Sequence, residues 1–200
     1  AKVDDSRLVL RVLDEARRDG ALALNYVAAE APLVERQRVR GLALRDTETG
    51  VTIAVHAKSV LNATGAWADR LRAGLGREPM MRPLRGSHLV IAHWRLPVAP
   101  SITLLHPDDG RPVFFYPWEG ATLVGTTDLE HAEDLMHEPR ITPAEVRYLL
   151  DAVNSQFPRA ALRENDVIAS FAGVRPIVGT PGGRPSDADR EHVVVDEAGL

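Results

Sequence analysis

Three short segments combine side chains that can bind or react with residues that shape the backbone. The segment Arg85-Gly86-Ser87-His88 places a cation, a flexible glycine, a hydroxyl and an imidazole in successive positions. Arg175 ends an apolar run and precedes a proline that restricts the backbone, and an arginine held in this way can bind an anion through two hydrogen bonds. Asn62–Trp67 carries small residues between an apolar run and a helix, where a planar ligand or a pyrophosphate can approach the backbone. Taken singly, each segment also fits a turn with an incidental polar residue.

Several other reaction classes have no matching motif. Gly179–Gly183 lacks the Lys-Ser/Thr of a P-loop, and the sequence contains neither a Gly-x-Gly-x-x-Gly dinucleotide fingerprint nor a Gly-x-Ser-x-Gly elbow. The histidines do not have the spacing of a helical zinc motif. One polar stretch can be interpreted either as a cation site or as a solvated loop, and contains Asp128, Glu130, His131, Glu133 and Asp134. The solvated loop is the favoured interpretation, so no metal site is predicted.

The composition is that of a globular domain. The chain has 200 residues, no cysteine and a net charge of −4. The absence of cysteine excludes disulfides and thiolate zinc sites, and the mild acidity argues against a nucleic-acid partner. No apolar run approaches the roughly 20 residues of a membrane span. Only two of the 24 basic residues are lysines, Lys2 and Lys58, and the arginine fork suits phosphate or carboxylate.

The first third of the chain predicts a helix followed by short strands. Acidic residues at Asp4 and Asp5 favour a helix start, apolar residues follow at helical spacing, and Gly20 favours its end. Turn residues at 46–50 separate two of the next runs. The strands predicted here are Ala21–Ala28, Arg38–Arg45, Val51–Ala57 and a short one at Ser59–Asn62, followed by a helix over Ala66–Leu75.

Beyond Pro79 the sequence predicts a sheet with one long helix. Frequent prolines exclude long helices up to residue 117. Thr142-Pro143-Ala144-Glu145 has the pattern of a capping box and predicts a helix that ends near Asn154. The predicted strands are His88–His93, Val113–Tyr116, Thr122–Gly125, Val167–Phe171 and His192–Val195.

Six strings of residues follow one another along almost the whole chain. They are Val60–Asp69, Leu84–Val90, Phe114–Trp118, Leu123–Asp128, Glu145–Leu150 and Phe171–Pro176. In this order they resemble the FAD-dependent glycerol-3-phosphate dehydrogenases, which are D-amino-acid-oxidase-like flavoproteins. Arg85 stands where that family often has lysine, and Ala66 where proline is common. The family's N-terminal dinucleotide fingerprint, its later glycine-rich flavin segment and its helical C-terminal domain have no counterpart here, so we expect an internal fragment that is inactive alone.

The resemblance implies a reaction and a role for individual residues. It implies oxidation of sn-glycerol 3-phosphate to dihydroxyacetone phosphate by hydride transfer to FAD, with electrons passing to quinone. Arg175 is the first choice for binding the phosphate and Arg190 the second. His88 would act as the base for the C2 hydroxyl, and Arg85 would assist the anion or stabilise reduced flavin. The residues implied to contact FAD are Val27, Ala28, Thr64, Gly65 and Trp67.

The expected fold is α+β with two regions. Residues 1–76 are expected to be part of an FAD-binding domain, with a three-stranded antiparallel meander, and residues 77–200 an incomplete substrate domain with a mixed, largely antiparallel sheet and flanking helices. The resemblance also implies a cytoplasmic enzyme and leaves peripheral membrane association and a homodimer open. Two alternatives to the dehydrogenase remain open. One is an oxidase of the same family acting on glycerol 3-phosphate or an amino acid, and the other is a non-catalytic ligand-binding module.

Overall fold

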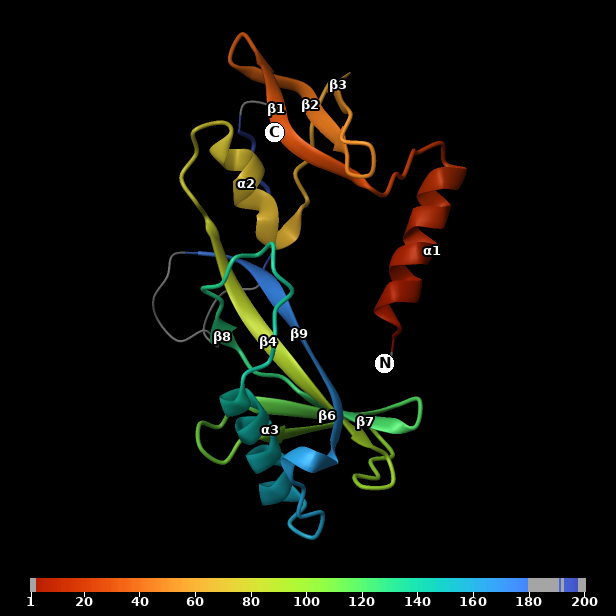
Figure 1. Cartoon of the computed structure of the whole chain (residues 1–200), viewed down its shortest axis with the longest axis vertical. Helices are drawn as coiled ribbons and strands as arrows, with labels where there is room; N and C mark the ends of the chain where they lie inside the picture. Colours follow the sequence, from red (N-terminus) through yellow and green to blue (C-terminus); the bar gives the residue numbers. More distant parts are fainter. Residues whose placement is uncertain (1–2, 180–190, 192, 198–200) are drawn as a thin grey trace. The chain divides into compact units, whose positions relative to one another are not determined.

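The chain folds into two compact units. The computed structural model describes residues 3–179, 191 and 193–197. Contacts divide the chain into one unit of Ala1–Leu61 with Asp196–Leu200 and a second unit of Asn62–Val195, whose elements are labelled in Figure 1. The segment that follows Leu61, including the predicted flavin-contacting turn, therefore packs with the second unit.

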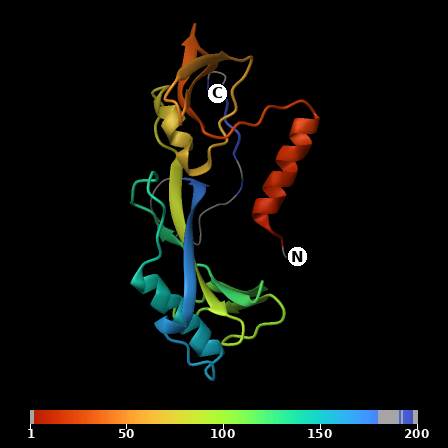
Figure 2. The same cartoon turned by 45° about the vertical axis from the view of Figure 1, so that its right-hand side comes forward.

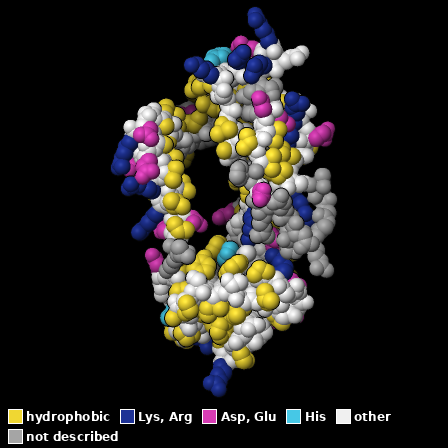
Figure 3. All heavy atoms as spheres, turned by 180° about the vertical axis from the view of Figure 1, so that it is seen from behind, with side chains coloured by type: hydrophobic (Ala, Val, Ile, Leu, Met, Phe, Trp, Pro, Cys, Tyr) yellow, Lys and Arg dark blue, Asp and Glu magenta, His cyan; other side chains and the backbone are white. Residues whose placement is uncertain are grey.

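The first unit begins with an amphipathic helix, α1 (Asp5–Arg18). The side chain of Asp4 caps it by accepting a hydrogen bond from the backbone N–H of Arg7 at 3.0 Å. Gly20, with φ of +93°, follows the helix end, as predicted. Figure 3 shows hydrophobic side chains along one side of this helix and charged ones along the other; the exposed apolar residues are Leu8, Val9, Leu10, Val12 and Leu13.

The rest of the first unit is the predicted antiparallel meander. Its strands are β1 (Val27–Glu35), β2 (Arg38–Asp46) and β3 (Thr52–His56), with β2 in the middle. The turn between β2 and β3 forms because Asp46 Oδ1 accepts backbone hydrogen bonds from Glu48 and Thr49 at 2.8 and 3.0 Å.

Two strands predicted in this part of the sequence are wrong. The first strand does not cover Ala21–Ala28: it starts at Val27 and continues through Pro32. Proline is tolerated there because β1 is an edge strand. Residues 59–62 form no strand, and the short 3-10 turn Gly65–Trp67 and helix α2 (Ala68–Ala73) follow them.

The second unit is built on a long central strand, β4 (Met81–Ala92). One edge of β4 pairs with β9 (Val167–Val178) along almost its full length, and the two strands run side by side in both Figure 1 and Figure 2. The remaining strands complete an antiparallel sheet and are β5 (Ile102–Leu105), β6 (Pro112–Trp118), β7 (Ala121–Gly125) and β8 (Leu129–Glu130). The α+β class predicted from the sequence is confirmed.

The pairing of β4 is interrupted opposite a short polar segment. His88 pairs with Gly125 on β7, and Arg85 pairs with Leu129 on β8. The three residues 126–128 therefore lie opposite only two residues of β4, Gly86 and Ser87. An excess residue of this kind bends a strand and redirects side chains. We call residues 126–128 the Thr-Thr-Asp segment.

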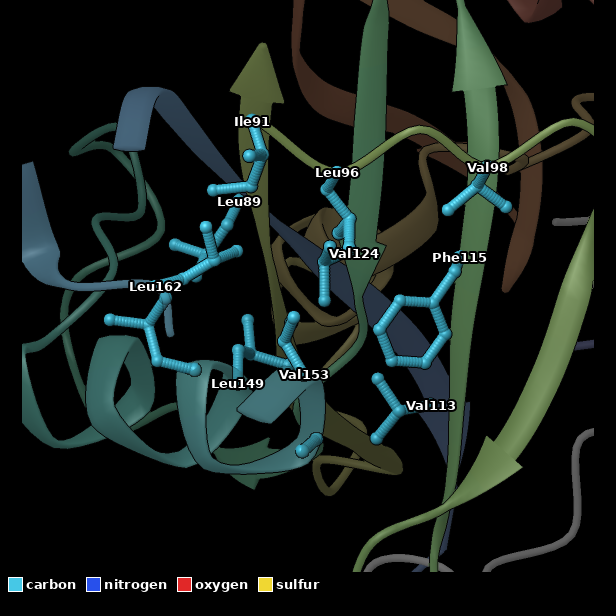
Figure 4. Packing of buried hydrophobic residues seen from close by; sticks show 12 residues of the cluster. Leu89, Ile91, Leu96, Val98, Val113, Phe115, Val124, Leu149, Val153 and Leu162 are labelled. Carbon is cyan, nitrogen blue, oxygen red and sulfur yellow. The ribbon is translucent and has the colours of Figure 1, made fainter. Parts of the chain in front are cut away.

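The core of the second unit lies between the sheet and helix α3 (Pro143–Gln156). The capping box predicted for this helix is present, with Thr142 at the N-cap and Glu145 at N3. Figure 4 shows side chains of α3 directed toward the strands, where Leu149 and Val153 pack on the same cluster as Leu89 and Phe115. Burial of each such side chain contributes about 1.5–3 kcal/mol.

The strands β4 and β9 are longer than the predicted runs His88–His93 and Val167–Phe171, and each continues through a proline. Pro83 lies opposite Pro176 in the register of the two strands. Residues 193–195 are not in a strand, contrary to the prediction for His192–Val195, and His192 itself lies outside the described residues. None of the helices in the described part of the chain has the length and apolar character needed to cross a bilayer.

Candidate active site

Two glycines of the sheet leave room for the two predicted functional side chains. Gly86 and His88 are two residues apart on β4, and Arg175 lies on the neighbouring strand β9. Side chains two apart on a strand point to the same face. A Cβ on Gly86 would overlap the guanidinium of Arg175, and a Cβ on Gly125 would overlap the imidazole of His88. The structure therefore brings His88 and Arg175 to one face of the sheet.

The guanidinium of Arg175 is held by the Thr-Thr-Asp segment. It donates hydrogen bonds to Thr126 Oγ1 at 2.9 Å, to the Thr127 carbonyl at 3.3 Å and to Asp128 Oδ1 at 3.2 Å. Asp128 is buried and also pairs with Arg111 at 3.3 Å. About a quarter of the Arg175 side chain remains exposed, at 28%. This arrangement fixes the direction of a partly accessible cation, which is what bidentate anion binding requires.

His88 is a largely buried, neutral imidazole. Its ring stacks on Phe171 with the centroids 4.7 Å apart and the planes 6° from parallel. Burial and the positive charge of Arg175 lower the pKa of His88 from 6.5 to about 4, so the ring is uncharged near neutral pH. Its Nδ1 is buried and has no hydrogen-bond partner in the described part of the chain. A neutral imidazole with an unpartnered nitrogen can accept a proton.

Arg85 lies on the opposite face of β4. It is an odd number of residues from His88, and its buried guanidinium pairs with Glu145 at 3.0 Å and with Glu133 at 3.7 Å. The structure does not bring Arg85 to the face that carries His88 and Arg175. Arg190 lies outside the described residues.

The turn that contains Thr64, Gly65 and Trp67 lies close to the end of β9. Thr64 donates a hydrogen bond from its hydroxyl to Asn62 Oδ1 at 2.7 Å, which stabilises the turn. Gly65 has φ of +61°, a conformation that favours glycine, and a Cβ there would meet Pro176 at an ordinary 3.9 Å. Trp67 is half exposed and lines a pocket of about 380 Å³, while its indole N–H donates to the Leu135 carbonyl at 3.2 Å. Gly65 and Pro176, the residue after Arg175, are thus neighbours.

Val27 and Ala28, the other residues predicted to contact FAD, belong to the first unit. They start β1 and pair with Asp46 and Arg45 of β2. Both are partly buried.

Some residues of the site were not identified from the sequence. Arg111 and Phe171 were not singled out as individual site residues, and Asp128 was considered only as part of an acidic cluster. The signal for the Thr-Thr-Asp segment is its position directly after an apolar strand, where polar residues gather at a strand end. No comparable local signal exists for Arg111, which reaches Asp128 from the loop before β6.

The sequence and the fold both resemble those of known proteins. The family profile described as FAD dependent oxidoreductase matches residues 1–197. An alpha-glycerophosphate oxidase of Streptococcus pyogenes serotype M6 is 38% identical over 96% of this chain and 33% of its own length. An aerobic glycerol-3-phosphate dehydrogenase of Bacillus subtilis is 35% identical over 100% of this chain and 36% of its own length. The chain therefore spans about a third of the length of these curated relatives.

Solved structures agree with the sequence comparison. The glycerol-3-phosphate dehydrogenase of Bacillus halodurans, solved with FAD, superposes with a TM-score of 0.84 at 36% identity and covers 88% of this chain and 36% of its own. The L-alpha-glycerophosphate oxidase of Mycoplasma pneumoniae has a TM-score of 0.54 at 23% identity over 78% of this chain and 39% of its own, which shows a shared fold. The chain belongs to the family of FAD-dependent oxidoreductases.

Proposed function

We propose that this chain carries the substrate-binding part of an FAD-dependent enzyme that oxidises sn-glycerol 3-phosphate to dihydroxyacetone phosphate. The observation that carries the proposal is the pairing of a neutral imidazole, His88, with an oriented cation, Arg175, on one face of the sheet. An enzyme that oxidises a phosphate-bearing alcohol needs both groups: a base that accepts the hydroxyl proton and a cation that binds the phosphate anion. The names of the relatives at 35–38% identity support this choice of substrate.

Arg175 is the proposed phosphate ligand. Its hydrogen bonds to Thr126, Thr127 and Asp128 fix the plane of the guanidinium. Arg175 and Arg111 both pair with Asp128, so two guanidinium groups flank one carboxylate. A phosphate dianion would be attracted to these cations.

His88 is the proposed general base. Its pKa of about 4 keeps it deprotonated and ready to take the proton of the C2 hydroxyl. The positive charge of Arg175 is one of the two causes of this low pKa. A phosphate anion bound to Arg175 would offset that charge and raise the pKa of His88, which strengthens the base once substrate is present.

The described residues fit part of a flavin site. Among the described residues, the half-exposed ring of Phe171 offers an aromatic surface to a planar ring system. Thr64, Gly65 and Trp67, beside the end of β9, are the proposed contacts within the second unit, and Val27 and Ala28 those within the first. FAD, when bound, supplies the acceptor for the hydride that leaves C2 of the substrate.

The proposed electron acceptor is quinone, and oxygen is the second candidate. One relative is named a dehydrogenase, at 35% identity, and another is named an oxidase, at 38% identity. The oxidase name supports oxygen as the second candidate. A cytoplasmic enzyme with peripheral membrane association and a homodimer belong to the same proposal and rest on the family resemblance alone.

The test uses the protein as its gene encodes it, purified with its flavin. Glycerol 3-phosphate is added without oxygen, and the loss of flavin absorbance is followed. We expect rapid bleaching by glycerol 3-phosphate and little by glycerol at the same concentration. Equal bleaching by both compounds, or by neither, would contradict the proposed substrate. Reoxidation by oxygen or by a soluble quinone then identifies the acceptor.

A further inference from the structure

The capping box of α3 contains a carboxylate in an unusual place. In a capping box the N3 glutamate accepts a hydrogen bond from the N-cap backbone N–H, and an exposed glutamate on the helix surface is sufficient for this. Here Glu145 is only 2% exposed and lies under the sheet that carries the candidate active site. Burying a carboxylate is unfavourable unless hydrogen bonds compensate for the lost water.

The two oxygens of Glu145 both accept hydrogen bonds from Arg85 and otherwise serve different partners. Oε2 accepts hydrogen bonds from the Thr142 backbone and hydroxyl at 2.8 and 2.9 Å, which is the capping function, and it pairs with Arg85 at 3.0 Å. Oε1 accepts hydrogen bonds from the hydroxyls of Ser87 at 2.8 Å and Thr127 at 2.7 Å. Burial alone would raise the pKa of Glu145, but the hydrogen bonds outweigh burial and lower it to about 2. The side chain is therefore a carboxylate at any pH of interest.

Thr127 connects this carboxylate to Arg175. Its Oγ1 accepts a hydrogen bond from the Ser87 backbone N–H at 2.9 Å, so its own hydroxyl proton is directed to Glu145. Its backbone carbonyl accepts a hydrogen bond from Nη1 of Arg175 at 3.3 Å. One residue thus has its side chain bonded to Glu145 and its carbonyl bonded to Arg175.

We propose that Glu145 is a positioning residue, which holds the Thr-Thr-Asp segment through Thr127 and thereby orients Arg175 toward its anion. The proposal rests on the proposed role of Arg175 in binding phosphate. The capping of α3 needs only Oε2, whereas Oε1 is devoted to β4 and to the Thr-Thr-Asp segment. The Thr-Thr-Asp segment needs such a support because it leaves the regular ladder between β7 and β8. Capping of the helix alone does not require the hydrogen bond between Glu145 and Thr127.

The decisive variant is Thr127→Val, which removes the hydroxyl and keeps the shape. In the flavin-loaded protein as its gene encodes it, we expect the KM for glycerol 3-phosphate to rise about tenfold while kcat changes by less than about twofold. Thr127→Ser restores the hydroxyl and should return KM close to the wild-type value. Glu145→Gln should raise KM at least as much if it folds, because the Gln amide group presents a donor where every partner is a donor.

The matched control is Thr142→Ala. This variant removes the N-cap side chain on the other oxygen of Glu145 and leaves the bond to Thr127 in place. We expect it to lower the melting temperature and to leave KM unchanged. Equal KM values in wild type and Thr127→Val, or equal increases in Thr127→Val and Thr142→Ala, would overturn the proposal.

A second measurement does not depend on the substrate. The Thr127 amide donates to the Ser87 carbonyl at 3.4 Å, so its hydrogen exchange reports how firmly the Thr-Thr-Asp segment is held. After correction for each variant's global unfolding free energy, hydrogen exchange at the Thr127 amide should be faster in Thr127→Val and in Glu145→Gln than in Thr142→Ala. Unchanged exchange would refute the positioning role whatever the substrate is. Faster exchange in a protein that does not oxidise glycerol 3-phosphate would refute the proposed function and leave the support of the segment established.

Discussion

The guanidinium of Arg175 on β9 fills the space that a side chain at Gly86 on β4 would occupy, because a Cβ on Gly86 would overlap it. Glycine is therefore needed at position 86 to make room for Arg175, and not to form a turn. Gly86 has no positive φ that would explain it otherwise. The same face of β4 carries His88, so the arginine and the imidazole share one short stretch of sheet.

Gly86→Ala should impair substrate binding and lower stability moderately. The displaced guanidinium is the end of a flexible side chain and can move aside, but it then loses its bonds to the Thr-Thr-Asp segment, including the one to buried Asp128. We expect KM for glycerol 3-phosphate to rise at least about tenfold, and the lost hydrogen bonds should lower the unfolding free energy by about 1–3 kcal/mol. Steady-state kinetics and urea unfolding measure the two effects.

Gly173→Ala is the matched control, because Gly173 lies opposite Gly86 on β9 and a Cβ there meets nothing within 4 Å. It adds a methyl group to the same face of the sheet without displacing Arg175, so its KM should rise less than that of Gly86→Ala. Equal KM values in both alanine variants would show that Gly86 does not make room for Arg175.

Gly125→Ala should act on the chemical step. The added Cβ would overlap the imidazole of His88 and push the ring out of its stack with Phe171. We expect kcat to fall by about 10²-fold, the usual contribution of a general base, with a smaller change in KM. A variant whose kcat equals that of Gly173→Ala would argue against His88 as the base.

The buried imidazole also makes stability depend on pH. The pKa of His88 is about 4 in the folded protein and 6.5 as a model value. Between these values the unfolded chain binds a proton that the folded chain does not, so the free energy of unfolding decreases as pH falls through this window. The shift corresponds to at most about 3 kcal/mol.

Urea unfolding at about pH 7 and about pH 4.5 measures this loss of stability. His88→Gln, which cannot be protonated, should lose less stability than wild type on acidification. The control is His56→Gln, which replaces an exposed histidine of β3 and should behave as wild type. A loss of stability in His88→Gln as large as in wild type would contradict the buried, neutral state of His88.

The β1–β2 hairpin contains a turn whose residues are not typical of turns, so the sequence does not predict it. Arg36 and Gln37 both have positive φ, 50° and 63°, between the paired residues Glu35 and Arg38. This is the geometry of a type I′ turn, which favours Asn-Gly. Replacing Arg36-Gln37 with Asn-Gly should increase the free energy of unfolding by about 1 kcal/mol. Thermal and urea unfolding test it, and a less stable variant would mean that the turn is of another type.

Local patterns in the sequence predicted the elements with local causes. The helix α3 follows from Thr142, Pro143 and Glu145, and the β2–β3 turn follows from Asp46, because each depends on hydrogen bonds within a few residues. The end of β1 was missed because the turn that follows it, Arg36-Gln37, contains neither glycine nor asparagine. The full lengths of β4 and β9 were missed because they depend on the pairing of these two distant strands, which continues through Pro83 and Pro176.

The candidate site depends on contacts between distant parts of the chain. Arg175 and His88 meet because β4 and β9 pair in one register, which no local spacing encodes. The separation of Arg85 from His88 was within reach of the sequence, since residues three apart on one strand point to opposite faces. The predicted strand began at His88, and this truncation hid the relationship.

The most direct test of the central claim compares two substrates in two proteins. The values of kcat/KM for glycerol 3-phosphate and for glycerol, which lacks the phosphate, are measured in the wild-type protein and in Arg175→Ala. If Arg175 binds the phosphate, the variant loses about 10²-fold or more in kcat/KM with glycerol 3-phosphate and almost nothing with glycerol. An equal loss with both substrates, or an unchanged value with glycerol 3-phosphate, would contradict the assignment.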